Sequence, residues 1–157
     1  MKIILTGATG VLGSHIMYDI LENFMTHNIE GKLFLITRNK GKVSAKERIN
    51  ELLSSNYTPK FLLDKGVDKL NEYLEIIDTD LATLQDTFSE KIKGAYFIHS
   101  AGYVNLSTDA DQKEKIFNEN AAITKAIFKT FSPACALRNS PCSFNNFNAF
   151  HCFGLWL

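Results

Sequence analysis

The chain has 157 residues, 45% of them hydrophobic, and its 17 basic and 17 acidic side chains leave no net charge. This length predicts one globular domain, and the balanced charge argues against nucleic acid or an anionic membrane surface as the main partner. No stretch reaches the roughly 20 apolar residues of a membrane span. The N-terminal apolar run ends at Gly7, too early for a signal peptide, so a cytoplasmic protein is expected.

The chain begins MKIILTGATGVLG, an apolar run that ends in three regularly spaced glycines. Residues Lys2–Leu5 predict a short buried parallel strand, whereas a helical period begins only after Gly10. The glycines therefore lie at a predicted strand-to-helix turn. We expect Gly7 to adopt the angles of a tight turn, Gly10 to let a pyrophosphate approach the main chain, and Gly13 to let the helix pack against the strand. The free N–H groups of the helix N-terminus would face the phosphates.

An ordinary glycine-containing loop is the alternative, because glycine triplets are common. A Walker phosphate loop is excluded, since Gly13 is followed by Ser14 and His15 instead of a Lys-Ser/Thr pair. The apolar residues of the following helix predict a buried side formed by Leu12, Ile16, Ile20 and Phe24. The predicted pyrophosphate site consists of Thr6, Gly7, Thr9, Gly10, Val11, Leu12 and Gly13.

Residues Lys32–Thr37 predict the second strand, which is followed directly by Arg38. In dinucleotide-binding folds an acidic side chain at this point binds the free ribose of NAD, whereas arginine accommodates the 2′-phosphate of NADP. Because no acidic residue is present here, Arg38, with Lys40 as a weaker second, favours NADP over NAD. A solvated surface charge is the alternative.

The connection from Asn39 to Asn71 is longer than a simple crossover requires. Ser44 and Glu47 have the spacing of a capping box. They predict a helix whose buried face carries Ala45, Ile49, Leu52 and Leu53. A second short helix is predicted after Thr58, with Pro59 at its first position and Gly66 at its end.

Residues Tyr73–Ile77 predict the third strand, and a helix carrying Leu84, Phe88 and Ile92 should follow. Between them, Asp80 is positioned to hydrogen-bond an adenine amino group while Leu81 covers the ring. Capping of the following helix is the alternative role for Asp80.

Residues Ala95–His99 predict the fourth strand. The small residues Ala101 and Gly102 follow it and leave room for a dinucleotide against the main chain. His99, like His15, is expected to be a hydrogen-bonded core residue and not an acid or base.

A long helix is predicted from about Asp109 to Phe131, with Ile116, Ile123 and Ile127 on one face. Asn120 lies inside this helix. Its amide could serve the site by holding a water or a neighbouring backbone group, or it could simply be exposed.

Residues Met1–Phe131 resemble the extended short-chain dehydrogenase/reductase superfamily, which carries a TGxxGxxG turn at its N-terminus. Within it they resemble the thioester-reductase and fatty acyl-CoA reductase branch, also known as the male-sterility-type NAD-binding domain. The matching features are the arginine after the second strand, an Ala-x-x-Arg-Ile helix, the Asp80-Leu81 pair and the His99 to Asn105 segment. One departure is Ile123, where the family's Asn-x-x-Gly-Thr helix has glycine. The resemblance implies the N-terminal portion, about four strands, of a Rossmann-type doubly wound α/β sheet that binds NAD or NADP.

The resemblance also implies catalysis by a Ser/Thr and a Tyr-x-x-x-Lys pair, which these 157 residues lack, so no catalytic residue is assigned. Residues 132–157 contain all three cysteines, the only tryptophan and a single charged residue, Arg138. No zinc site is readable among these cysteines. The expected organisation is an incomplete NAD(P)-binding domain over 1–131 and an atypical tail over 132–157, whose composition is typical of a frameshifted end. A genuine apolar strand at the sheet edge is the alternative for the tail.

The leading functional hypothesis is the NADP(H)-binding part of a reductase that converts an acyl thioester to an aldehyde and is inactive alone. Acyl-CoA or an acyl carrier protein would be the partner of the complete protein. Two alternatives stay open: a non-catalytic dinucleotide-binding or regulatory module, and the cofactor half of a sugar-nucleotide epimerase or reductase.

Overall fold

The computed structural model describes residues 1–80, 94–103 and 110–136. The described residues fall into two compact units. The first contains Met1–Thr79 and Gly94–Ala101, and the second contains Asp80, Gly102, Tyr103 and the long C-terminal helix. Each unit is described by itself.

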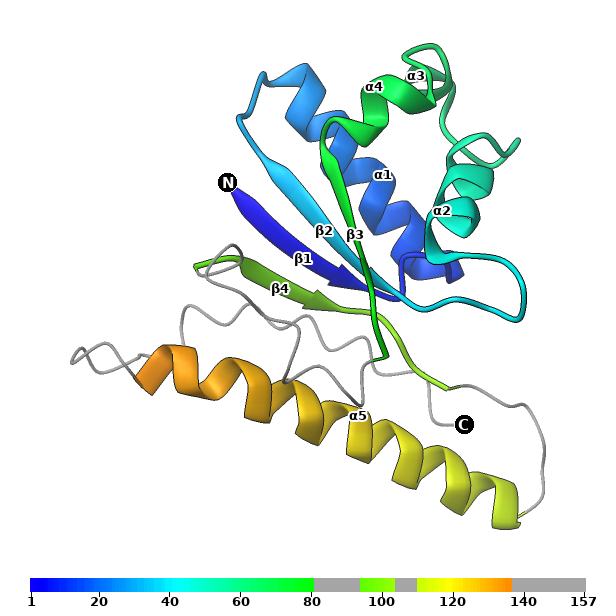
Figure 1. Cartoon of the computed structure of the whole chain (residues 1–157), viewed down its shortest axis with the longest axis vertical. Coiled ribbons are helices and arrows are strands. Elements are labelled where there is room, and N and C mark those ends of the chain that lie inside the picture. Colours follow the sequence, from blue (N-terminus) through cyan, green and yellow to red (C-terminus); the bar gives the residue numbers. More distant parts are fainter. Residues whose placement is uncertain (81–93, 104–109, 137–157) are drawn as a thin grey trace. The chain divides into compact units, whose positions relative to one another are not determined.

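The first unit is built on a parallel sheet of four strands in the order β3-β2-β1-β4 (Figure 1). The strands are β1 (Lys2–Thr6), β2 (Lys32–Thr37), β3 (Leu74–Asp78) and β4 (Tyr96–His99). All three pairings are parallel, and Leu5 of β1 lies in register with Leu35 of β2 and Ile98 of β4. Each strand lies within one residue of its predicted position, and the predicted N-terminal portion of a Rossmann-type α/β fold is confirmed. The order reverses between β1 and β4, which places a topological switch point at their carboxyl ends.

Four of the described helices cover one face of this sheet (Figure 1). They are α1 (Val11–Thr26), α2 (Ala45–Leu53), α3 (Lys60–Leu63) and α4 (Val67–Asn71). The predicted capping box of α2 is present, because Ser44 and Glu47 each bond the other's backbone N–H. Pro59 is the N-cap of α3, whereas the sequence predicted that it would be the first residue of the helix. The sequence did not predict α4, which begins after Gly66, a residue with φ +77°.

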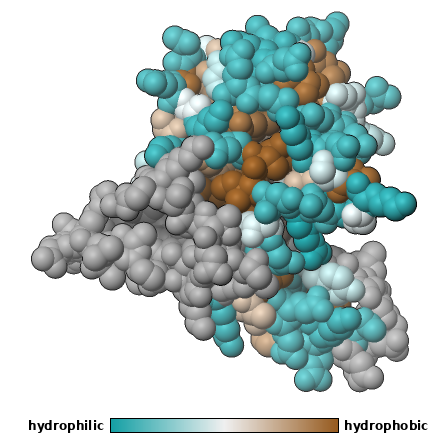
Figure 2. Space-filling model, viewed as in Figure 1, coloured by the Kyte–Doolittle hydropathy of each residue, from teal (hydrophilic) through white to brown (hydrophobic). Residues whose placement is uncertain are grey.

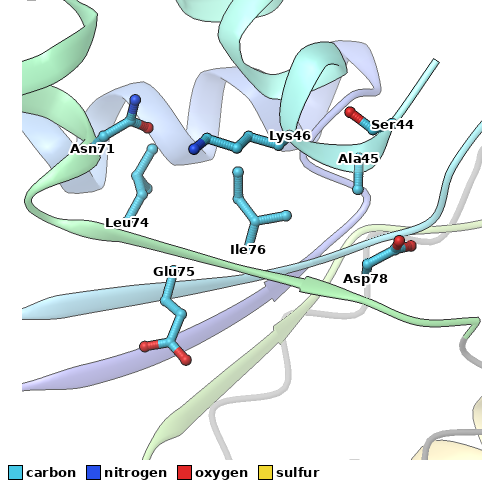
Figure 3. Close-up of a pocket in the computed structure, with 8 residues that line it drawn as sticks. All are labelled: Ser44, Ala45, Lys46, Asn71, Leu74, Glu75, Ile76 and Asp78. Atoms are coloured by element: carbon cyan, nitrogen blue, oxygen red, sulfur yellow. The ribbon is translucent and has the colours of Figure 1, made fainter.

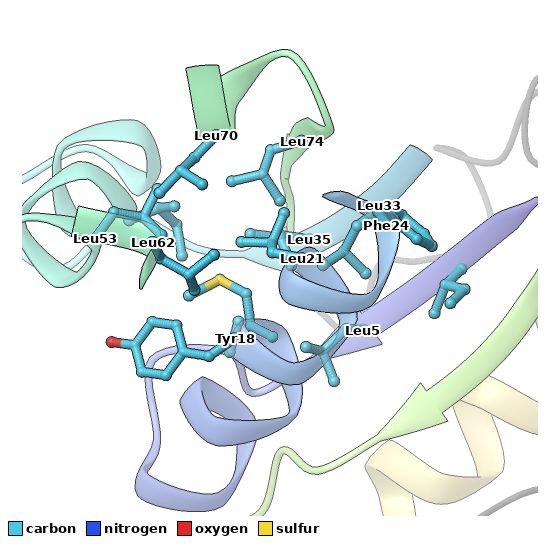
Figure 4. Close-up of a cluster of buried hydrophobic side chains, with 14 residues drawn as sticks. Leu5, Tyr18, Leu21, Phe24, Leu33, Leu35, Leu53, Leu62, Leu70 and Leu74 are labelled. Atoms are coloured by element: carbon cyan, nitrogen blue, oxygen red, sulfur yellow. The ribbon is translucent and has the colours of Figure 1, made fainter. Parts of the chain in front are cut away.

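Leucine side chains make up most of the core between the sheet and these helices (Figure 4). Strands β1 and β2 contribute Ile3, Leu5, Leu33 and Leu35. The crossover helices between β2 and β3, which are α2, α3 and α4, contribute residues such as Leu62 and Leu70. The alternate residues of the same strands, among them Ile4, Phe34 and Ile36, are also buried. Burial of both faces explains why these strands are continuously apolar. Hydrophilic residues dominate the surface over the crossover helices (Figure 2).

Of the four residues predicted on the buried side of α1, only Phe24 is fully buried. The buried apolar side chains of α1 are Met17, Tyr18, Leu21 and Phe24, whereas Ile16 and Ile20 are half-buried and Leu12 is 44% exposed. The physical reason is the close approach at Gly13, which brings the Gly13 side of α1 against the backbone of the β1–α1 turn. The residues that follow Gly13 at helical spacing therefore enter the core.

The second unit contains α5, which spans Ala110–Ala136 and so continues past the predicted end at Phe131. The predicted helix with Leu84, Phe88 and Ile92 lies outside the described residues, as do Leu81 and the segment 137–157. Among the helices that the structure describes, none is both long and apolar enough to cross a membrane.

Candidate functional site

The turn between β1 and α1 is held by its own backbone and by the segment after β4. The N–H of Gly10 donates to the carbonyl of Gly7 at 2.9 Å. Gly7 has φ +77°, and a Cβ there would lie 2.5 Å from the backbone nitrogen of Ala101. Both the backbone angle and this contact therefore require glycine. The predicted tight-turn conformation of Gly7 is confirmed.

Gly13 and Gly10 differ in what surrounds them. A Cβ on Gly13 would overlap the Gly7 carbonyl and come within 2.7 Å of Ser100 Oγ, so Gly13 lets the helix pack against the turn itself. A Cβ on Gly10 would meet only the Gly7 carbonyl, at 3.3 Å, and Gly10 has an ordinary extended backbone (φ −87°, ψ 166°). Packing among the described residues therefore requires glycine at position 13 much more than at position 10.

The N-terminus of α1 has the features of an anion site. Gly10 is its N-cap, no side chain caps it, and its first turn carries no acidic residue. Thr9, Leu12 and Val11 are exposed, Val11 by 82%. The first N–H groups of a helix have no partner within the helix, and the dipole makes this end positive. This end of α1 therefore presents donors suited to a phosphate group.

The carboxyl ends of β1 and β4 are tied together beside the turn. Thr6 Oγ1 lies 2.7 Å from His99 Nδ1, and the carbonyl of Thr6 accepts hydrogen bonds from Ser100 Oγ at 2.7 Å and Ser100 N at 3.2 Å. The prediction that His99 is hydrogen-bonded is confirmed. These bonds fix the strand end from which the turn begins, and they hold Ala101 against Gly7.

One arginine, Arg48, contacts the turn, and it is also hydrogen-bonded to the backbone of a second arginine, Arg38. Arg38 follows β2 and is exposed. Arg48, on α2, donates through Nη1 to the carbonyl of Arg38 at 2.6 Å and through Nη2 to Thr9 Oγ1 at 2.9 Å. The sequence did not single out Arg48 as a site residue. Its position in the Ala-x-x-Arg-Ile pattern was the available signal, and that pattern says nothing about its partners.

Of the predicted site residues that the structure describes, three belong to the second unit: Asp80, Gly102 and Asn120. Asp80 is exposed, and its predicted adenine contact stays a prediction. Asn120 Oδ1 accepts from the N–H of Tyr103 at 2.8 Å, while its Nδ2 donates to the carbonyl of Tyr103 at 3.0 Å. Of the roles considered for Asn120, the structure therefore shows the binding of a neighbouring backbone group. The other predicted residues, Thr6, Gly7, Thr9, Gly10, Val11, Leu12, Gly13, Arg38 and Ala101, belong to the first unit.

A pocket of about 420 Å³ lies between α2 and the edge strand β3 (Figure 3). Leu74 and Ile76 of β3 point toward α2, whereas Glu75 points away from it (Figure 3). The full lining is Ser44, Ala45, Lys46, Asn71, Leu74, Glu75, Ile76 and Asp78. None of these residues was predicted to bind the cofactor, so this pocket does not coincide with the predicted site.

Comparison with known proteins identifies a family and a set of similar folds. The NAD-binding family described as male sterility protein matches residues 5–130, more than half of the chain. A thiolation-reductase di-domain from an archaeal non-ribosomal peptide synthetase is 28% identical, with a TM-score of 0.58 over 84% of this chain and 32% of that chain. Among curated proteins, none matches the chain significantly.

Two further structures share the fold. The terminal R domain from the myxalamid PKS-NRPS biosynthetic pathway is 19% identical, with a TM-score of 0.59 over 85% of this chain and 32% of that chain. The NAD-bound dTDP-glucose 4,6-dehydratase DesIV from Streptomyces venezuelae is 12% identical, with a TM-score of 0.56 over 86% of this chain and 37% of that chain. The chain thus spans about a third of the length of these structures.

Proposed function

This chain belongs to the NAD-binding family described as male sterility protein, and we propose that it is the NADP(H)-binding part of an acyl-thioester reductase. Its predicted place in the thioester-reductase and fatty acyl-CoA reductase branch is confirmed for the N-terminal portion. A nicotinamide dinucleotide is the cofactor of this family. The observation that carries the proposal is the open turn at Gly10, directly before the uncapped N-terminus of α1.

The residues of the turn suit the pyrophosphate of such a cofactor. The backbone N–H groups of Val11 and Leu12 would donate to phosphate oxygens, and Gly10 would keep the approach free of a side chain. Ala101, beside Gly7, would leave room for the rest of the dinucleotide. When bound, NADPH supplies the hydride that a reductase transfers to its substrate.

The preference for NADP rests on Arg38. It is exposed directly after β2, and the residues that follow it are Asn39 and Lys40. Asn39 is already engaged, because its Oδ1 accepts from the N–H of Ala45 at 2.7 Å. A guanidinium forms charge-assisted hydrogen bonds with a 2′-phosphate, while no acidic side chain follows β2 here to bind a free ribose.

The proposed substrate class is an acyl group held as a thioester, on coenzyme A or on a carrier protein. The family match and the reductase domains among the similar structures support this class. The thiolation-reductase di-domain supports a carrier-bound acyl group in particular. A sugar-nucleotide enzyme is the second candidate, favoured only by fold similarity at 12–15% identity.

Cofactor titration of the 157-residue chain tests the proposal. We expect NADPH to bind at least tenfold more tightly than NADH, since one charge-assisted pair contributes about 1.5 kcal/mol or more. Arg38→Ala should remove this difference, whereas Lys42→Ala, which removes an exposed charge from the same loop, should preserve it. Equal affinities for the two cofactors in the unmodified chain would contradict the NADP preference, and absence of binding would contradict the function.

A further inference from the structure

The side chain of Arg48 joins two parts of the chain that are far apart in sequence. One is the glycine turn, through Thr9 Oγ1 at 2.9 Å, and the other is the end of β2, through the carbonyl of Arg38 at 2.6 Å. These are the two segments to which the proposed function assigns the pyrophosphate and the 2′-phosphate. Arg48 is half-buried.

Helix α2 holds Arg48 in place for this contact. Ser44 and Glu47 form the capping box at its start, and Ile49, the neighbour of Arg48, is fully buried in the core. The loop after β2 is tied to the same helix a second time, because Asn39 Oδ1 accepts from the N–H of Ala45. Arg48 thus extends from a fixed base, and its planar guanidinium reaches two acceptors at once, which a lysine ammonium on a flexible stem does much less well.

We propose that Arg48 is a positioning residue that fixes the pyrophosphate turn and the loop after β2 relative to each other. The inference rests on the proposed function. Two N–H groups of Arg48 donate to Thr9 Oγ1 and to the carbonyl of Arg38. Its loss therefore frees the turn as well as the loop. Because the turn serves the pyrophosphate common to both cofactors, NADPH and NADH binding weaken together.

A direct contact between Arg48 and a 2′-phosphate makes a different prediction. In that case the loss of Arg48 weakens NADPH binding alone, since NADH has no such phosphate. The effect on NADH binding therefore separates positioning, which weakens it, from direct recognition, which leaves it unchanged. A general loss of fold stability would not by itself change amide protection at the turn and the loop selectively.

The experiment compares Arg48→Lys, Thr9→Val and the control Lys46→Ala, which removes an exposed positive charge from the same helix. We expect Thr9→Val to weaken NADPH and NADH binding alike, about tenfold, as for one charge-assisted hydrogen bond. Arg48→Lys also frees the loop that carries Arg38, so it should weaken NADH binding at least as much and NADPH binding more. Combining the two substitutions should cost less than the sum of the two single effects, because either substitution removes the contact between Arg48 and Thr9. Lys46→Ala should bind both cofactors like the unmodified chain.

Amide hydrogen exchange without cofactor supplies the second readout. Arg48→Lys should speed exchange in residues 7–10 and 38–43 and leave β1 and β2 protected. If Arg48→Lys weakens only NADPH binding, or changes neither affinity nor exchange, the positioning role is wrong. If the unmodified chain binds no dinucleotide, the proposed function fails, and the exchange data alone decide whether Arg48 fixes the two segments. Thr9→Val tests the same contact from the other side should Arg48→Lys not fold.

Discussion

At the scale of single residues, the three glycines of the turn are constrained by different atoms. Gly7 combines φ +77° with a backbone neighbour 2.5 Å from where its Cβ would lie, and Gly13 faces the Gly7 carbonyl. Gly10 has an extended backbone, and a Cβ there would find only one atom, at 3.3 Å. The fold therefore depends on Gly7 and Gly13, whereas the requirement at Gly10 comes from the proposed ligand.

This difference predicts that Gly10→Val abolishes dinucleotide binding while the chain stays folded. The valine side chain would occupy the space that the phosphates need, yet extended backbone suits a β-branched residue. Cofactor titration and thermal unfolding of the same variant test both halves of the prediction. Gly13→Val is the matched comparison, and it should unfold the chain because its Cβ overlaps backbone. A Gly10→Val variant that still titrates normally would show that the turn is not the pyrophosphate site.

Both polar atoms of the Asn120 side-chain amide form hydrogen bonds. Oδ1 accepts from the N–H of Tyr103 and Nδ2 donates to its carbonyl, so the side chain pairs with Tyr103 as a neighbouring strand would. Gly102 lies next to this pair, and a Cβ there would make ordinary contact with Asn120 Oδ1 at 3.6 Å. Asn120 therefore orders the backbone that follows Ala101.

Asn120→Asp should break half of this pair. The shape is retained, but a carboxylate oxygen replaces the donor that faces the Tyr103 carbonyl. We expect a loss of about 1 kcal/mol in the free energy of unfolding and faster hydrogen exchange at the Tyr103 amide. Asn118→Asp introduces the same charge at an exposed position of α5 and should change neither. Unchanged protection of Tyr103 in Asn120→Asp would contradict the pairing.

At the scale of elements, helix α2 is stabilised by the capping box at its N-terminus. Ser44 N donates to Glu47 Oε2 at 2.8 Å, and Glu47 N donates to Ser44 Oγ at 3.2 Å. Because α2 carries Arg48, its first turn also supports the contact with the glycine turn.

Ser44→Ala should therefore lower the free energy of unfolding, measured by urea titration, by about 1 kcal/mol. Ser54→Ala, at the other end of the helix, serves as the comparison. An unchanged unfolding midpoint in Ser44→Ala would contradict the contribution of the cap.

The capping box also predicts a pH dependence. Hydrogen bonds from the backbone and then the side chain of Ser44 lower the pKa of Glu47 below its ordinary value. A carboxyl group whose pKa is lowered on folding stabilises the fold above its unfolded-state pKa, and this contribution is lost as the pH falls through the lowered value. Between neutral and acidic pH the unmodified chain should therefore lose more stability than Glu47→Gln. Parallel curves for the two proteins would rule out this contribution.

At the scale of the whole molecule, cofactor binding and hydride transfer are expected to separate. The chain spans about a third of the length of the reductase structures it resembles, and none of its tyrosines is followed by lysine four residues later. We therefore predict that the 157-residue chain binds NADPH saturably without oxidising it in the presence of an acyl-CoA. The absorbance of NADPH measures turnover directly. Sustained oxidation that depends on the acyl-CoA would contradict this prediction.

Much of this molecule follows from the sequence by itself. The four strands lie within one residue of their predicted positions, because each is a short apolar run between polar residues. The capping box and the turn at Gly7 were also predicted correctly, since both depend on residues only a few positions apart. Local chemistry determined these features.

Tertiary packing decided the rest. The sequence placed Leu12, Ile16 and Ile20 on the buried side of α1, but the close contact at Gly13 turned neighbouring residues into the core. Neither the bridge from Arg48 to Thr9 nor the pairing of Asn120 with Tyr103 has a local signature. The partners are separated by many residues in the sequence. Their contacts arise only after packing fixes where each element lies, and this is why spacing along the chain could not predict them.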